Sequence, residues 1–215
     1  INFTTGNIVE VNNYAYKNGK KGSRMGGMAY DKANDILYGI ETGYNDEGGK
    51  YSNVYRINPT TGEISDVATI NDHQLCAIAC DSKGSVYLVE NTYIDWTPYP
   101  QLYRLNADNS LETVVENKDV AGMASYTCSA LFSADDSKLY FHSYQDVGVF
   151  DLNAKTYSVA GSVNKPIAGL TYTLSTEDGV AAEKPASKMR FLVNKSWYGD
   201  HMGFGTDRVM TKEDI

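Results

Sequence analysis

The chain has 215 residues and a formal net charge of −8, with 17 tyrosines and 19 glycines beside only five prolines. Its acidic balance leaves no basic stripe for phosphate backbones or anionic lipid, and no apolar run reaches the ~18–20 residues that span a bilayer. We therefore expect neither nucleic-acid binding nor membrane insertion. The length fits one domain over residues 1–215, and the excess of tyrosine, which suits half-buried pleated surfaces, favours a β-rich fold.

A turn motif recurs along the chain at intervals of about 50 residues, and most copies follow a short aromatic or alternating strand. Its copies are Ile1–Gly6, Ile57–Gly62, Leu105–Asn109 and Leu152–Thr156. A different pair of short strands fills the other half of the period, at Met28–Asp31 with Ile36–Glu41, at Ala77–Asp81 with Val86–Glu90, and at Ala130–Ser133 with Leu139–His142. Each period therefore predicts four antiparallel strands, which we name A to D.

Four short antiparallel strands per ~40–50 residues are the unit of a β-propeller, in which each blade buries its faces against its neighbours. A β-sandwich also has closely spaced strands, but it does not explain the repeated sequence. We predict an all-β propeller with four visible blades, at about residues 26–70, 76–116, 127–163 and 167–206. The last blade lacks a strand D, and residues 1–11 supply one. A closed four-bladed ring and a piece of a larger propeller both fit this pattern.

The segments Val54–Glu63 and Leu102–Asn106 resemble the strand C to D hairpins of secreted and surface β-propeller repeat proteins of Bacteroidetes-type bacteria. This resemblance extends over roughly residues 1–206, and it implies a bacterial protein located outside the cytoplasm. It is specific for architecture only, because the Asn, Pro, Thr and Gly residues of these turns serve backbone geometry.

The cysteines offer little for metal or nucleophile chemistry. Cys76 and Cys80 lie on one predicted strand, too far apart for a disulfide, and Cys128 takes the place of Cys76 one period later. We expect small buried thiols, with a zinc site as the alternative. No metal site and no cofactor are predicted.

Two glutamates, Glu41 and Glu90, end strand B in consecutive periods. Two acids at one end of a propeller could hold a cation or a sugar hydroxyl. The other interpretation, which we prefer, is that both are solvated strand ends.

The segments between strands B and C are predicted to be long loops rich in aromatic residues. They cover Thr42–Tyr51, Asn91–Pro100, Ser143–Asp146 and Lys195–His201. Equivalent loops emerge at one end of a propeller, so their rings gather on one face, where they either bind a partner or cover the edge of their own blade. The candidate ligand-binding residues are Tyr44, Tyr93, Trp96, Tyr99, Trp197 and Tyr198, together with Glu41 and Glu90.

These patterns predict a non-catalytic recognition or scaffold module that binds a protein or glycan partner through the B–C face. The alternative is a hydrolase or lyase with its site at the central channel and with Glu41 and Glu90 as its acids. No phosphate-binding loop, serine nucleophile elbow or zinc-binding helix motif is found in the sequence. The oligomeric state stays open.

Overall fold

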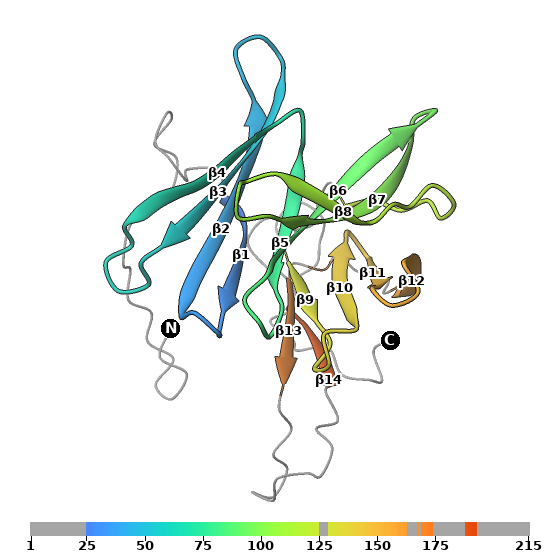
Figure 1. Ribbon diagram of the computed structural model, residues 1–215. Coiled ribbons are helices and arrows are strands. Elements are labelled where there is room, and N and C mark those ends of the chain that lie inside the picture. Colours follow the sequence, from blue (N-terminus) through green and yellow to red (C-terminus); the bar gives the residue numbers. More distant parts are fainter. Residues whose placement is uncertain (1–24, 125–128, 163–166, 168, 174–187, 193–215) are drawn as a thin grey trace, which may run out of the picture.

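The computed structural model describes residues 25–124, 129–162, 167, 169–173 and 188–192 of the chain. In this part the regular structure consists of β-strands, without a helix (Figure 1). It accordingly holds no helix long and apolar enough to cross a bilayer. The strands form three four-stranded antiparallel sheets and one two-stranded sheet, which confirms the all-β prediction.

Each four-stranded sheet follows the order of the chain. Sheet 1 consists of β1 (Met25–Asp31), β2 (Ile36–Tyr44), β3 (Lys50–Ile57) and β4 (Ile64–Asn71). Sheet 2 consists of β5 (Leu75–Cys80), β6 (Val86–Ile94), β7 (Thr97–Leu105) and β8 (Leu111–Val115). Sheet 3 consists of β9 (Ala130–Phe132), β10 (Lys138–Ser143), β11 (Asp146–Asp151) and β12 (Thr156–Ser162). The two-stranded sheet pairs β13 (Gly169–Thr173) with β14 (Lys188–Leu192).

Polar side chains close the turns because their oxygens accept bonds from backbone amides that have no strand partner. Between β1 and β2, the Asp31 carboxylate accepts the amides two and three residues later, at 2.9 and 3.1 Å. Between β5 and β6, the Asp81 carboxylate accepts the amides two and four residues later, at 2.9 and 2.8 Å. Asn58 repeats this arrangement between β3 and β4. The recurring turn residues therefore hold the recurring hairpins.

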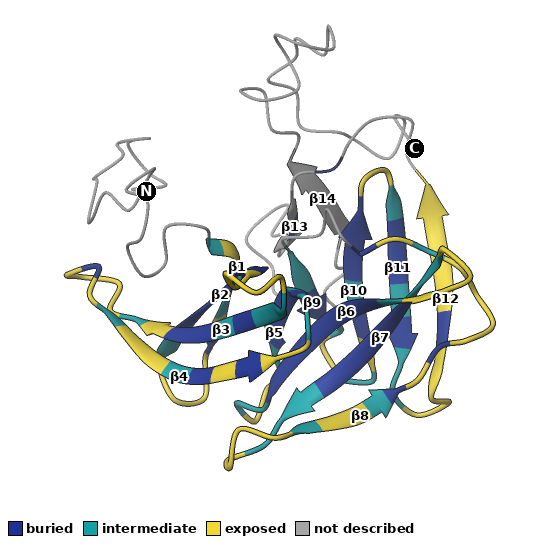
Figure 2. Ribbon diagram, turned by 90° about the horizontal axis from the view of Figure 1, so that it is seen from above, coloured by how far each residue is buried: buried dark blue, intermediate teal, exposed yellow. Residues whose placement is uncertain are grey.

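Neighbouring sheets pack face to face. Successive residues of a strand point to opposite faces, so the strands of sheet 2 contribute side chains both to the interface with sheet 1 and to the interface with sheet 3. Between sheets 1 and 2, Tyr38, Ile40 and Val54 meet Leu88 and Tyr103 in one buried cluster. The first strands of the sheets also lie next to one another, with β1 beside β5, β5 beside β9 and β9 beside β13. The last strand of sheet 3, β12, is exposed along most of its length (Figure 2).

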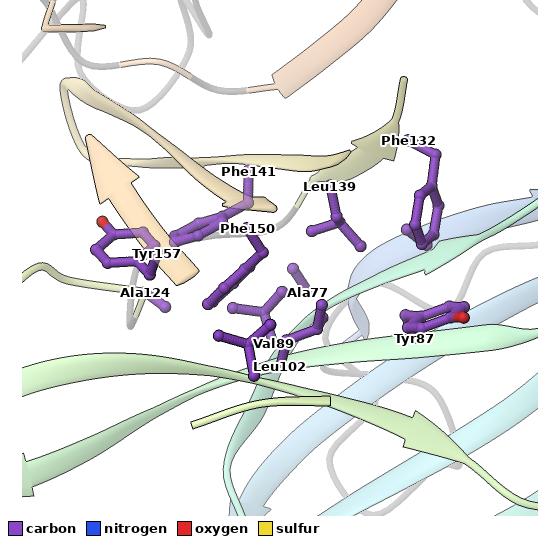
Figure 3. Packing of buried hydrophobic residues seen from close by; sticks show 12 residues of the cluster. Ala77, Tyr87, Val89, Leu102, Ala124, Phe132, Leu139, Phe141, Phe150 and Tyr157 are labelled. Atoms are coloured by element: carbon purple, nitrogen blue, oxygen red, sulfur yellow. The ribbon is translucent and has the colours of Figure 1, made fainter. Parts of the chain in front are cut away.

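An aromatic cluster fills the interface between sheets 2 and 3 (Figure 3). Phe141 and Phe150 stack at a centroid distance of 5.3 Å, and Phe150 contacts the Tyr157 ring at 5.2 Å. Sheet 2 contributes Val89 and Leu102 to the same cluster. A smaller cluster joins sheet 3 to β13 and to Ile167, which precedes that strand.

The prediction of long B–C loops is wrong for the first two sheets. β2 continues to Tyr44 and pairs there with Lys50, and β6 continues to Ile94 and pairs with Thr97. Most of the predicted loops Thr42–Tyr51 and Asn91–Pro100 is therefore strand. Threonine, tyrosine and isoleucine have high β-propensity, and this preference extends the paired strands. In sheet 2 the hairpin continues past both neighbouring strands, whereas in sheet 1 β4 pairs with β3 as far as Tyr51.

Several predictions fall outside the described residues. These are the strand at residues 1–11, the predicted loop Lys195–His201 with the rest of the fourth blade up to residue 206, and Cys128, Trp197 and Tyr198. Cys76 and Cys80 are thiols and are only partly buried. Burial, followed by the charges of Asp31 and Asp81, raises the pKa of Cys80 to about 12.

Candidate recognition site at the hairpin end

The antiparallel order of each sheet brings several connections to the same end of the sheets. Among them are the turns β2–β3, β6–β7 and β10–β11, and the connections β4–β5 and β8–β9 that lead from one sheet to the next (Figure 1). We call this the hairpin end. The β1–β2 and β3–β4 turns and their equivalents lie at the opposite end.

The β6–β7 hairpin projects beyond sheet 2. Pairing of β5 with β6 stops at Glu90, and pairing of β8 with β7 stops at Leu102, whereas β6 and β7 pair as far as Ile94 and Thr97. Asp95 and Trp96 form the two-residue turn with φ angles of 48° and 67°. Left-handed backbone at both central positions is typical of a type I′ turn, which normally uses Asn and Gly. Here a tryptophan takes the second position.

Trp96 is almost completely exposed, with 96% of its surface accessible. Its neighbours lie on the two faces of the hairpin. Ile94 and Tyr99 share the face of Glu90, which is turned toward sheet 1, because residues alternate along a strand. Tyr93 shares the face of Val89, which packs against sheet 3. The hairpin tip is thus apolar on both faces and at its end.

The other two hairpins also carry an aromatic residue at their tips. Tyr44 is 59% exposed and closes a five-residue loop, 45–49, in which Gly48 has a φ of 81°. Tyr144 is 36% exposed, with a φ of 52°. Tyr44 shares the face of Ile40 and is therefore turned toward sheet 2, as Tyr99 is turned toward sheet 1.

Exposed apolar side chains gather at the hairpin end. Of the ten exposed large hydrophobic residues in the described ranges, seven lie there: Tyr44, Tyr93, Ile94, Trp96, Val120, Met123 and Tyr144. Val120 and Met123 come from the β8–β9 connection, and neither was singled out from the sequence. Because scattered exposed hydrophobic residues need no explanation but a concentration of them does, this end is the candidate contact surface.

Glu90 is buried, so its interpretation as a solvated strand end is wrong. It is only 5% exposed. One carboxylate oxygen lies 2.7 Å from Nδ1 of His73, and the other accepts the backbone amide of Gln74 at 2.7 Å. Both partners belong to the β4–β5 connection, which is therefore held against sheet 2.

The Glu90 carboxylate raises the pKa of two neighbouring side chains. Its hydrogen bond raises the pKa of His73, against the opposing effect of burial. Burial, and then the charge of Glu90, raises the pKa of Tyr103 to about 12. The Tyr103 ring meets the His73 ring edge-on at 5.4 Å, and its hydroxyl donates to Gln101 at 3.0 Å.

Glu41 is also buried, at 6% exposure, and the solvated interpretation is wrong for this residue as well. Its carboxylate accepts a hydrogen bond from the Tyr55 hydroxyl at 2.7 Å. Burial and this bond raise the pKa of Tyr55 well above its ordinary value. Glu41 lies on the face of sheet 1 that is turned away from sheet 2, because Ile40 beside it faces sheet 2. The two glutamates therefore do not share a site.

Of the predicted site residues, the structure places Tyr44, Tyr99 and Glu90 on the facing sides of two adjacent sheets. Trp96 stands at the tip, Tyr93 faces sheet 3, and Trp197 and Tyr198 lie outside the described part. Within the described ranges, no group of three or more His, Cys, Asp or Glu side chains is arranged to hold a metal ion.

A cleft of about 700 Å³ opens between sheets 1 and 2 at the opposite end. Tyr38, Arg56 and the turn that contains Asn106 line it, together with other residues of these sheets. None of the predicted ligand-binding residues lines this cleft.

Comparisons with known proteins give no family for the chain: no family model and no curated protein matches it. Among solved structures, the extracellular domain of a putative hybrid two component system from B. thetaiotaomicron is 14% identical, with a TM-score of 0.36. That match covers 63% of this chain and 18% of the other. TolB from Acinetobacter baumannii is 12% identical with a TM-score of 0.32, over 69% of this chain and 46% of the other. The chain thus spans less than half the length of either solved chain.

Proposed function

We propose that the chain forms a β-propeller, or part of one, and that it acts as a non-catalytic recognition module whose hairpin end contacts a protein or glycan partner. The radial arrangement is supported by the adjacency of β1, β5, β9 and β13, because propeller blades meet along their innermost strands. The β13–β14 pair is then the beginning of a fourth blade, in a closed four-bladed ring or in a larger one.

The resemblance of the recurring turns to those of secreted and surface repeat proteins supports a location outside the cytoplasm. The segments that carry this resemblance, Val54–Glu63 and Leu102–Asn106, lie in the antiparallel β3–β4 and β7–β8 hairpins.

The observation that carries the recognition proposal is the exposure of Trp96 on a projecting hairpin. A bulky residue in left-handed backbone costs on the order of 1 kcal/mol or more, and such strain is typical of functional positions. Six of the other nine exposed large hydrophobic residues in the described ranges lie at the same end of the sheets as Trp96. Tryptophan is enriched among the residues that dominate binding energy.

The hydrolase or lyase alternative gains no support from the two glutamates. Glu41 and Glu90 are buried, each accepts hydrogen bonds within the fold, and sheet 1 lies between them. Paired catalytic carboxylates need to face one reacting bond.

The test is a screen of the full chain on a glycan array and in affinity capture, repeated with Trp96→Ala. We expect a bound glycan or protein whose affinity falls at least about 30-fold in the variant. Val159→Ala, at a 45% exposed position on β12, is the matched control and should bind normally. The proposal is wrong if no partner is found, or if every partner binds Trp96→Ala as well as the unmodified chain.

A further inference from the structure

The β8–β9 connection enlarges the apolar surface of the β6–β7 hairpin. The backbone amide of Gly122 donates to the carbonyl oxygen of Pro98 at 2.9 Å, and Pro98 pairs with Tyr93 across the hairpin. Met123 follows Gly122 directly and Val120 precedes it by two residues, and these side chains are 41% and 38% exposed. The hydrogen bond thus brings the segment that carries Val120 and Met123 beside the hairpin that carries Tyr93 and Trp96, and we call these four residues the hairpin patch.

The position of Gly122 fixes this connection on one side of the hairpin. A Cβ atom at Gly122 would lie 2.6 Å from the Tyr157 hydroxyl and 3.3 Å from Pro100 Cγ. Gly122 is thus enclosed between the hairpin and sheet 3, which is the side that Tyr93 faces. Gly122 and the Tyr93 side chain therefore lie on the same side of the hairpin.

The chemistry of the hairpin patch suits a protein better than a glycan. Sugar recognition combines an aromatic ring with several converging hydrogen-bonding groups. Here the neighbours of the rings are a valine and a methionine, whose side chains offer apolar area and a flexible thioether. Aromatic residues and methionine are the types enriched in protein interfaces.

The charges beside the hairpin patch are negative. Asp95 precedes Trp96 in the turn and Asp119 precedes Val120, and both are exposed. Neither carboxylate forms an ion pair within the described part of the chain. Lys118, the nearest cation in sequence, lies 2.6 Å from the Glu116 carboxylate and is partly neutralised by it. A partner that matches this surface needs basic side chains around an apolar socket.

We infer that the partner of the hairpin end is a protein that receives Trp96 in an apolar socket flanked by lysine or arginine. This inference rests on the proposed function and specifies its partner. The two-residue turn holds the indole on a paired hairpin, so little backbone freedom is lost on binding. Asp95 and Asp119 contribute mainly to the rate of association and to its dependence on salt.

The experiment is a selection of a phage-displayed random peptide library on the full chain, with Trp96→Ala as the counter-selection target and a glycan array run in parallel. We expect enriched peptides that combine aromatic or aliphatic residues with lysine or arginine. A synthetic peptide of this kind should bind at least about 30-fold more weakly to Trp96→Ala. It should bind several-fold more weakly to the double variant Asp95→Asn, Asp119→Asn, and Val159→Ala should match the unmodified chain.

Other results separate this inference from the proposed function. If glycans bind in a way that depends on Trp96 and no peptides are enriched, the inference of a protein partner is wrong, but the proposed recognition function is still supported. Enriched peptides without basic residues, or an unchanged affinity of the double Asp variant, overturn the charge-matched partner. A dimer in sedimentation that Trp96→Ala dissociates identifies a second copy of the chain as the partner and also overturns the inference. If no peptide, protein or glycan binds in a way that depends on Trp96, both the proposed function and this inference are wrong.

Discussion

The hydrogen bond between His73 and Glu90 holds the β4–β5 connection against the buried face of sheet 2. Their side chains meet at 2.7 Å, and the neighbouring amide of Gln74 donates to the same carboxylate. From sheet 1, the Ser52 hydroxyl donates to the carbonyl oxygen of His73 at 2.9 Å and accepts the amide of Leu75 at 2.8 Å. The connection is therefore bound to both sheets, at the same end as the two hairpins that carry Tyr44 and Trp96.

This arrangement predicts a pH-dependent stability. The pKa of His73 is raised above its ordinary value of 6.5 by the bond to Glu90. A group whose pKa is higher in the folded state stabilises the fold fully below its unfolded-state pKa, and this contribution is lost as pH rises through the folded-state pKa. We expect the free energy of unfolding to decline from about pH 6.5 upward, measured by urea unfolding at several pH values.

The control is His73→Gln, which keeps a donor near Glu90 but does not titrate. Its unfolding free energy should lack the part of the pH dependence that belongs to His73, so the difference between the two proteins should shrink as pH rises. A constant difference across this range would show that the protonated imidazole adds nothing.

A second prediction concerns Glu41. Tyr55→Phe removes a hydrogen bond to a buried carboxylate without changing the packing of the ring, and it should lower the free energy of unfolding by about 2 kcal/mol. Tyr93→Phe is the matched control, because Tyr93 is 50% exposed, and it should change stability by less than about 0.5 kcal/mol. Equal effects in chemical denaturation would mean that the bond to Glu41 is not a stabilising contact.

The repeat in the sequence was sufficient to predict the four-stranded sheets, because the same turn residues and the same tyrosines return in each period. Tyr38 and Tyr87 are buried at equivalent positions of β2 and β6. The burial of Glu90 is also predictable from the sequence. Glu90 lies on the same face of β6 as Val86 and Leu88, and that face packs against sheet 1. A charged residue at the end of such a pattern nevertheless suggests a solvated strand end, because its partner His73 lies in the connection before β5 and gives no periodic signal.

The projecting β6–β7 hairpin is not predictable from the repeat in the same way. Asn91, Pro98 and Pro100 are residues that normally mark loops, and they led to the prediction of a long loop at that place. Proline is tolerated here because β7 has no further strand beside it beyond Leu102. The apolar contribution of Val120 and Met123 depends on the contact of Gly122 with the hairpin, a long-range relationship that no local pattern reveals.

A third prediction follows from the left-handed backbone of Trp96. Trp96→Gly relieves the steric cost of a φ of 67° at the second turn position, and it should raise the free energy of unfolding by about 1 kcal/mol while it removes the anchor of the hairpin patch. Tyr93→Gly, in extended backbone of the same hairpin, should do the opposite and cost about 0.5–1 kcal/mol. Urea unfolding of both variants measures the contrast. A loss of stability in Trp96→Gly would show that the indole is a structural contact and would argue against its role in recognition.

The last prediction tests the aromatic cluster between sheets 2 and 3. A Cβ atom at Gly148 would lie 2.6 Å from Phe141 Cζ and 2.8 Å from Tyr157 Cε2, within rings that already stack on one another. Gly148→Ala should therefore lower the free energy of unfolding by about 1–3 kcal/mol, because the rings must leave their packed positions. The matched control is Gly161→Ala on the exposed strand β12, where a Cβ atom would meet nothing within 4 Å and stability should stay the same or rise slightly. If the two variants unfold at the same denaturant concentration, the rings of Phe141 and Tyr157 are not packed over Gly148.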